Sequence, residues 1–285
     1  MELKYAQLVC DSQGNIGDDI QSLAAAIHLP RIDFTIDRES IHKWNCEQPA
    51  ALIMNGWFSA NAAAWPPSRS IRPVFVGFHV TDRLKPTIRQ HVDYFKRFEP
   101  IAVRDEATGG FLGSLGIKTD VLFCLTLTFP QRQSEPKNGK VYLVDATSIA
   151  VPRSLRRGAI KMSHQVAPLG HQTTLPYARS LLEMYRDTAS MVITTRLHAA
   201  LPCIAMGIPV VFFGSASDGR TAIVKDIGGK IYDIRWHRKA LARGLVGRAI
   251  DSVDWSPKPL DITAVKNRLA AAVSSRLAAI KRDYS

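Results

Sequence analysis

An arginine and a histidine stand one residue apart within an apolar stretch of the sequence. The segment "TTRLHAALP" (194–202) carries Arg196 and His198 and is followed by "CIAMGIPVVFF". Both fall where a strand (191–194) should give way to a helix (197–207), so a guanidinium, an imidazole and free backbone N–H groups would meet there. This combination suits the binding of a carboxylate or a phosphate. The alternative is a satisfied core histidine and an arginine that bridges two domains.

A second candidate lies near the N-terminus in "CDSQGNIGDDIQ", where a strand should run into a helix. Gly14 and Gly17 allow the backbone to approach a ligand, and Asn15 can hydrogen-bond an anion or a hydroxyl. The segment is not a GxGxxG turn, and it lacks the Gly-Lys pair of a P-loop. Asp18 and Asp19 could belong to the site, or they could merely complement the dipole of the following helix.

A third junction, "VRDEATGGFLGSLGI", places Arg104 directly after a short predicted strand. Asp105 stands at the expected N-cap, three residues before Thr108. The pattern fits an anion contact through Arg104, and it fits equally well a capped helix with a surface arginine.

The other histidines give no metal-binding pattern. None stands in HExxH or a comparable ligand spacing, so we expect neither a metal site nor a cofactor. His164 in "KMSHQV" follows a predicted strand and is the second histidine that could reach a cleft. His171, in a glycine-bearing loop, is expected to be incidental. The sequence also lacks a GxSxG element and a recognisable Cys–His nucleophile pair.

Short apolar runs alternate with amphipathic segments along the chain, which predicts βαβ units and mainly parallel sheets. The predicted strands are 5–10, 51–55, 73–78, 101–103, 121–123, 140–145, 159–162, 191–194 and 209–213. The predicted helices are 16–28, 83–98, 105–116, 175–189, 197–207 and about 261–281. In such sheets ligands bind at the carboxyl ends of the strands, where all three junctions would lie.

The polar segment "PQRQSEPKNGK" is the best candidate for an interdomain linker. We predict an α/β fold of two doubly wound Rossmann-like domains that face a cleft. The N-terminal α/β domain would span 1–130, the linker 131–139, and the C-terminal α/β domain with the RLH element 140–258. Residues 259–285 would form a C-terminal helix that could pack back on the N-terminal domain.

The composition is that of a globular protein that attracts anions. Hydrophobic residues make up 46% of the 285 residues, and the formal net charge is +12. Nucleic acid, phosphorylated metabolites and acidic lipid would all be attracted to such a surface. The basic segments 153–158 and 266–282 lack interleaved aromatic residues, so nucleic acid is not the expected partner. Four widely spaced cysteines and the lack of a secretory signal or membrane span predict a cytoplasmic protein.

Five segments, in this order, resemble the polysaccharide pyruvyl transferases. They are "GNIGDD", "MNGWF" followed by "WPPS", "VRDEATGGFLGSLGI", "CLTLT" and "MVITTRLHAALPCIAMGIPVVFF", and the last is the most specific. The resemblance implies two domains similar to the GT-B glycosyltransferases, with the active site between them. It also implies that Arg196, Leu197 and His198 bind phosphoenolpyruvate, that His198 is the acid, and that Arg104 contacts the same ligand. The turn in the first segment is expected to line the cleft.

The resulting hypothesis is an enzyme that transfers the enolpyruvyl group of phosphoenolpyruvate to a sugar as a cyclic pyruvate ketal. His198 would protonate the enol, a sugar hydroxyl would attack, phosphate would leave, and a second hydroxyl would close the ring. The acceptor would be a polysaccharide repeat carried on a lipid diphosphate, and the basic protein would bind peripherally to the anionic inner membrane. Trp57 could stack on a sugar ring, or it could be a core residue. The remaining residues expected in the cleft are Gly14, Asn15, Asp18 and His164.

Two other functions fit parts of the pattern. A GT-B glycosyltransferase that uses a nucleotide sugar would share the fold, although the second block shows no acidic ribose-binding residue. A catalytically inactive family member could act as a scaffold, but Arg104, Arg196 and His198 are all present.

Overall fold

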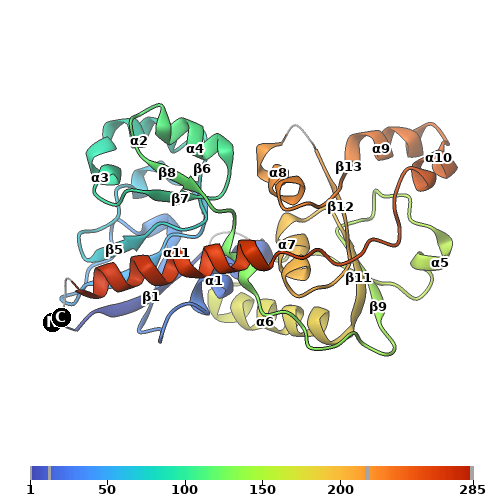
Figure 1. The fold of residues 1–285 in the computed structure, drawn as a ribbon, viewed down its shortest axis with the longest axis horizontal. Helices are drawn as coiled ribbons and strands as arrows, with labels where there is room; N and C mark the ends of the chain where they lie inside the picture. The colour runs from blue at the N-terminus through green and yellow to red at the C-terminus, as the bar shows by residue number, and fades with distance from the viewer. Residues whose placement is uncertain (1, 12–13, 216–217, 283–285) are drawn as a thin grey trace.

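The computed structural model describes residues 2–11, 14–215 and 218–282, in which strands and helices alternate (Figure 1). The strands are β1 (Lys4–Val9), β2 (Phe34–Asp37), β3 (Ala50–Ile53), β4 (Gly56–Phe58), β5 (Ile71–Val74), β6 (Phe78–Val80), β7 (Ile101–Val103), β8 (Thr119–Val121), β9 (Lys140–Val144), β10 (Ile160–Met162), β11 (Ala189–Thr194), β12 (Val210–Gly214) and β13 (Ile231–Asp233). The α-helices are α1 (Ile16–Ala26), α2 (Lys85–Gln90), α3 (Val92–Lys96), α4 (Glu106–Gly113), α5 (Arg153–Arg156), α6 (His171–Thr188), α7 (Leu197–Ala205), α8 (Gly219–Asp226), α9 (Ile234–Ala242), α10 (Val246–Asp251) and α11 (Thr263–Arg282).

The strands of the first half form two parallel sheets. These sheets have the orders β2-β1-β3-β5 and β4-β6-β7-β8, and β3 leads directly into β4 as β5 leads into β6. Gly77 lies between β5 and β6 and has φ +71, and a Cβ atom there would clash with Asn55 Oδ1. The single strand predicted at 73–78 is therefore wrong, because only glycine fits the backbone conformation and the space at this point.

The second half builds one parallel sheet of order β10-β9-β11-β12-β13. Within the described residues, every ladder between these strands is parallel, as is every ladder of the first half. Central strand β11 is buried along most of its length, because helices cover the sheet on both sides. The mixed α/β fold with parallel sheets is thus confirmed.

Several local predictions need correction. The sequence pattern does not predict strands β2, β4 and β13, since each has only three or four residues. The strand predicted at 121–123 instead ends at Val121, and Phe123 adopts φ +72, which a strand does not allow. Helix α6 begins at His171 rather than near 175, so His171 is not a loop residue. Its Nδ1 lies 2.7 Å from Asp11 Oδ1.

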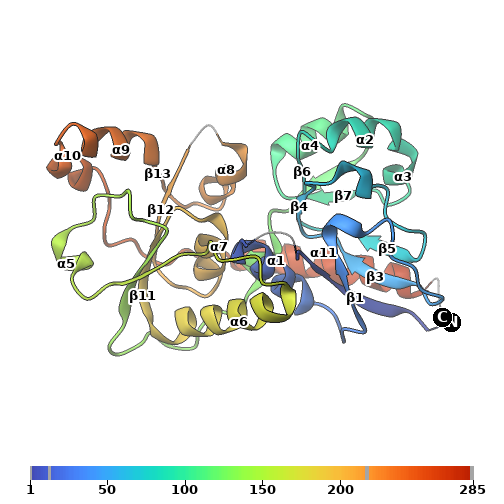
Figure 2. The ribbon, with the colours of Figure 1, turned by 180° about the vertical axis from the view of Figure 1, so that it is seen from behind.

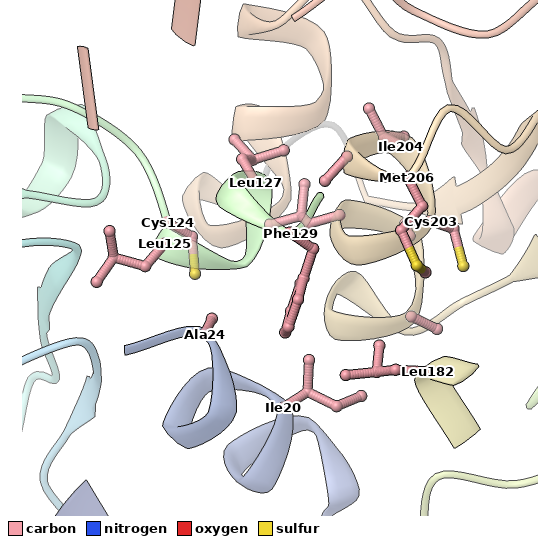
Figure 3. Packing of buried hydrophobic residues seen from close by; sticks show 14 of the residues in the cluster. Ile20, Ala24, Cys124, Leu125, Leu127, Phe129, Leu182, Cys203, Ile204 and Met206 are labelled. Atoms are coloured by element: carbon pink, nitrogen blue, oxygen red, sulfur yellow. The ribbon is translucent and has the colours of Figure 1, made fainter. Parts of the chain in front are cut away.

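Helix α1 follows the first strand of the first half but packs against helices of the second half. It contacts α6 and α7, and Figure 2 shows α1 beside α6. Figure 3 shows Ile20 and Ala24 of α1 facing Leu182 of α6 and Phe129, with Ile204 of α7 in the same cluster. The two halves therefore share one apolar core, and burial of these side chains stabilises their relative placement.

Helix α11 runs along the first half although its sequence follows the second (Figure 1). Its Leu277 and Ile280 pack against Leu3 and Tyr5 of the first half. At its other end, the ammonium of Lys266 donates hydrogen bonds to the backbone carbonyls of Phe129 and Ala205. No helix in the part of the chain that the structure describes combines the length and apolarity needed to cross a membrane.

Candidate functional site

A cavity of about 490 Å³ lies where the two halves of the chain meet. Residues from both halves line it, including residues at the N-terminal ends of α1, α7 and α8. Three helix N-termini give the cavity a favourable potential for an anion. The residues of the sequence prediction that line it are Asn15, Asp18, Trp57, Arg104, His164, Arg196, Leu197 and His198.

Arg104 presents a buried guanidinium to the cavity. The residue is 2% exposed and lies directly after β7. Its Nε has no hydrogen-bond partner, and its contact with a carboxylate is a 3.5 Å approach to Asp105 Oδ2. A buried cation without hydrogen-bond partners is costly, so this side chain is well placed to receive an anionic ligand. The surface arginine that the sequence also allowed is thereby ruled out.

Arg196 is held in place by an acidic residue that the sequence did not single out. Its Nε donates a 2.6 Å hydrogen bond to Asp145 Oδ2 at the end of β9. Although burial opposes the effect, hydrogen bonds from Ser163, the His164 backbone N–H and Arg196 lower the pKa of the Asp145 carboxyl. Asp145 therefore stays ionised and fixes the guanidinium at the N-cap of α7.

His198 lies in the first turn of α7, as predicted, and faces the same cavity. Burial, and then the positive charge of Arg104, hold the pKa of its imidazole well below the usual range. Its Nε2 lies 3.9 Å from the sulfur of Cys124, a pair that the sequence did not reveal. Burial raises the pKa of the Cys124 thiol, so this cysteine is not a thiolate nucleophile.

Gly17 gives the His198 ring its space. A Cβ atom at position 17 would lie 3.1 Å from His198 Cβ and 3.2 Å from His198 Nδ1. The same atom would lie 3.2 Å from Asn15 Oδ1, which caps α1. The contact between α1 and α7 thus sets the position of the imidazole.

On the sequence hypothesis that His198 is the catalytic acid, Gly17→Ala is expected to lower kcat by about tenfold, because the added methyl group displaces the imidazole. The fold should persist, since alanine favours a helix more than glycine does. Steady-state assays compare it with Gly110→Ala, where a Cβ atom would meet nothing within 4 Å. Equal kcat values for the two variants would contradict the role of Gly17.

His164 is fully buried at the edge of the cavity. Its Nε2 lies 2.8 Å from the hydroxyl of Tyr185, its Nδ1 has no hydrogen-bond partner, and its carbonyl accepts the N–H of Ile16 at the start of α1. Burial lowers the pKa of the imidazole to about 4. His164 therefore remains neutral near pH 7 and joins the second half to the N-terminus of α1.

The depressed pKa of His164 makes stability depend on pH. In the unfolded chain this histidine regains its ordinary pKa of 6.5 and binds a proton that the folded one refuses until about pH 4. The free energy of unfolding should therefore fall by about 2 kcal/mol from this group between pH 7 and pH 5. In urea titrations at the two pH values, His164→Gln should lose less stability than wild type. Identical losses would show that His164 titrates normally when folded.

The N-terminal turn is built as a cap as well as a cavity wall. Asn15 caps α1 through the N–H of Gly17, and Asp18 Oδ1 accepts a 2.9 Å hydrogen bond from buried Arg38. The guanidinium of Arg38 also lies 5.3 Å from the ring centre of Trp57, which faces the cavity from β4. Gly14 does not line this cavity, because its carbonyl accepts hydrogen bonds from the segment that follows His164.

Sequence reasoning missed the residues that α8 supplies. Arg220 lines the cavity and is paired with Asp218, the N-cap of α8. With Arg104 and Arg196, it gives the cavity three guanidinium groups. The signal was available, since Asp218 follows a predicted strand in "FFGSASDGRTA". Three arginines and a histidine can bind a small, highly charged anion and deliver a proton to it.

Among residues 2–11, 14–215 and 218–282 there is no cluster of three histidine, cysteine or acidic side chains that could hold a metal ion.

The profile of the family described as "Polysaccharide pyruvyl transferase" matches residues 15–217. No curated protein sequence shows a significant match. The chain is also similar to a functionally uncharacterised protein of Klebsiella pneumoniae, with 12% identity, a TM-score of 0.45, and coverage of 78% of this chain and 88% of that one. The family profile covers most of the sequence and includes Arg104, Arg196 and His198, so this chain belongs to the polysaccharide pyruvyl transferase family.

Proposed function

We propose that this enzyme transfers the enolpyruvyl group of phosphoenolpyruvate to a sugar of a cell-surface polysaccharide repeat, forming a cyclic pyruvate ketal. The observation that carries the proposal is Arg104, whose buried guanidinium lacks a hydrogen-bond partner at Nε and lines the same cavity as His198. Phosphoenolpyruvate carries a carboxylate and a phosphate, and the guanidinium groups of Arg104, Arg196 and Arg220 match both.

In the proposed mechanism His198 protonates the methylene carbon of the enolpyruvyl group. The free imidazole is neutral because its pKa is depressed, so it must gain a proton as the substrate binds. The phosphate supplies the negative charge that favours the imidazolium form. The resulting oxocarbenium-like carbon is attacked by a sugar hydroxyl, and guanidinium groups stabilise the phosphate as it leaves. The reaction needs neither a metal nor a cofactor.

The proposal also covers the domains around the site, the acceptor and the place in the cell where the enzyme works. The sheets of residues 4–121 and of residues 140–233 are proposed to act as two GT-B-like domains around the cavity. The acceptor is proposed to be attached to a lipid diphosphate, and the enzyme to work in the cytoplasm at the inner face of the membrane. The net charge of +12 and the free cysteines support this placement. The family match does not favour the alternative of a glycosyltransferase that uses a nucleotide sugar.

The test is incubation with phosphoenolpyruvate and a panel of p-nitrophenyl β-galactoside, β-glucoside, β-mannoside and β-N-acetylglucosaminide. Phosphate release that depends on one of these glycosides, with a product mass increased by a ketal-linked pyruvyl group, is the expected result. Thermal shifts with phosphoenolpyruvate and with UDP-glucose form the second arm. Stabilisation by UDP-glucose alone would replace the proposal with the glycosyltransferase.

A further inference from the structure

A second cavity, of about 600 Å³, adjoins the first. The two share Trp57, Asp218 and Arg220 in their walls. The rest of the wall comes mainly from the first half: from His79 and Val80 of β6, from the segment that follows this strand, and from the start of α4. It is rich in hydroxyl and charged side chains and has one aromatic face, that of Trp57, which suits a sugar ring.

A histidine and an aspartate in this wall form a tight pair. Nδ1 of His79 lies 2.6 Å from Oδ2 of Asp105, and both residues are buried. The other carboxylate oxygen of Asp105 accepts the backbone N–H of Thr108 at the start of α4. The Thr108 hydroxyl lies 3.3 Å from the same ring nitrogen and accepts the N–H of Val80. The ring of His79 is therefore fixed in position from several sides.

The pairing with Asp105 uses Nδ1 of His79 and leaves Nε2 able to accept a hydrogen bond or a proton. Although burial opposes it, the hydrogen bond with His79 lowers the pKa of the Asp105 carboxyl to about 2, so the carboxylate accepts and Nδ1 carries the proton. Burial lowers the pKa of His79, which makes its neutral form dominant near pH 7. In that form Nε2 bears a lone pair, and no hydrogen bond to it occurs within the described residues.

The pair also touches the proposed donor site. Oδ2 of Asp105, which binds His79, lies 3.5 Å from Nε of Arg104. Arg104 therefore links the pair to the cavity that holds His198. The charged groups that shift the pKa of His79 are Asp105, Arg104 and Arg220. In turn, His79 affects the pKa values of Asp82, Asp218 and His198.

We propose that the second cavity binds the acceptor sugar and that His79, positioned by Asp105, is the general base for its attacking hydroxyl. This inference rests on the proposed pyruvyl transfer. The hydroxyl O–H bond breaks, its proton moves to Nε2 of His79, and the oxygen bonds to the carbon that carries the phosphate. His198, in the first cavity, protonates the neighbouring methylene carbon.

The overall reaction balances in protons and bonds without another reactant. The bond from carbon to the phosphate oxygen breaks with its electron pair, and the second sugar hydroxyl supplies the second carbon–oxygen bond. Of the two hydroxyl protons, one ends in the new methyl group and the other on the released phosphate. Two histidines with separate neighbours thus serve as acid and base at adjacent positions: His198 protonates the methylene carbon, and His79 takes the proton of the hydroxyl that attacks the next carbon.

His79→Asn tests the proposal, because the asparagine amide can keep the hydrogen bond to Asp105 while Nε2 is removed. With the p-nitrophenyl glycoside that supports phosphate release, kcat should fall by about 10²–10⁴-fold. The affinity for phosphoenolpyruvate, measured by calorimetry, should remain that of wild type. In wild type, kcat/KM for the glycoside should fall as the pH drops through the pKa of His79. This acidic limb should be absent in the residual activity of the variant.

The matched control is His91→Asn, a histidine of the same half outside both cavities, which should behave as wild type. Asp105→Asn is the second variant. It keeps an oxygen to cap α4 but lets the amide donate to Nδ1 of His79, so it should also lower kcat. A His79→Asn enzyme with wild-type kcat and an unchanged pH profile would overturn the inference. A wild-type kcat/KM for the glycoside that does not change at acidic pH would also overturn it. This measurement needs no variant, so it can be made even if the variants do not fold. Failure of the proposed function looks different, because wild type itself would neither bind phosphoenolpyruvate nor release phosphate.

Discussion

Arg104→Met is expected to weaken phosphoenolpyruvate binding by about 10²–10³-fold, because it removes a desolvated guanidinium from the cavity that is proposed to bind this anion. The loss should be accompanied by little change in the stability of the free protein. The variant gives up a 3.5 Å contact with Asp105, but it also relieves the cost of a buried cation that has no hydrogen-bond partner at Nε. Calorimetry measures the affinity, and urea unfolding without ligand measures the stability.

Arg104→Lys separates charge from geometry. It keeps the positive charge but loses the planar fork, so its affinity should lie between those of the methionine variant and wild type. Arg186→Met is the surface control, since Arg186 lies on α6 and pairs with its neighbour Asp187. An Arg104→Met enzyme with wild-type affinity for phosphoenolpyruvate would place the anion site elsewhere.

His198→Gln is expected to lower kcat by about 10²–10⁴-fold while phosphoenolpyruvate still binds, because the proposed acid is removed and the three arginines remain. A second readout follows from the protonation state. The pKa of His198 lies well below 6.5 in the free enzyme, so wild type should take up a proton when the anion binds at neutral pH. Calorimetry in buffers of different ionisation enthalpy measures that uptake, which should be absent in His198→Gln.

The pH dependence has a defined direction. The imidazolium form must be present in the complex, so kcat of wild type should fall as the pH rises through the raised pKa of bound His198. This alkaline limb should disappear from the residual activity of His198→Gln. His91→Gln is the control for the substitution itself. If His198→Gln retained wild-type kcat and the same proton uptake, another residue would have to be the acid.

The sequence was sufficient for features that depend on a few neighbouring residues. Asn15 and Asp105 stand at the starts of predicted helices, and the structure shows both side chains accepting backbone N–H groups. The junction of β11 and α7 followed from an apolar run (191–193) that ends shortly before Arg196. These signals are local, because strand pleating, helix periodicity and capping are set over two to four residues.

Only the tertiary structure decided which of these junctions share a cavity and what surrounds each side chain. Asp145 and Arg196 are 51 residues apart in sequence, and His79 and Asp105 are 26 apart. Such pairs depend on which strands lie side by side, β9 next to β11 and β6 next to β7, and the local sequence pattern does not determine that order. The sequence by itself identified Arg104 and His198 as chemical groups of the right kind. Packing decided that Arg104 would be buried without a hydrogen-bond partner at Nε and that His198 would be neutral, because burial and neighbouring charge are properties of the folded chain.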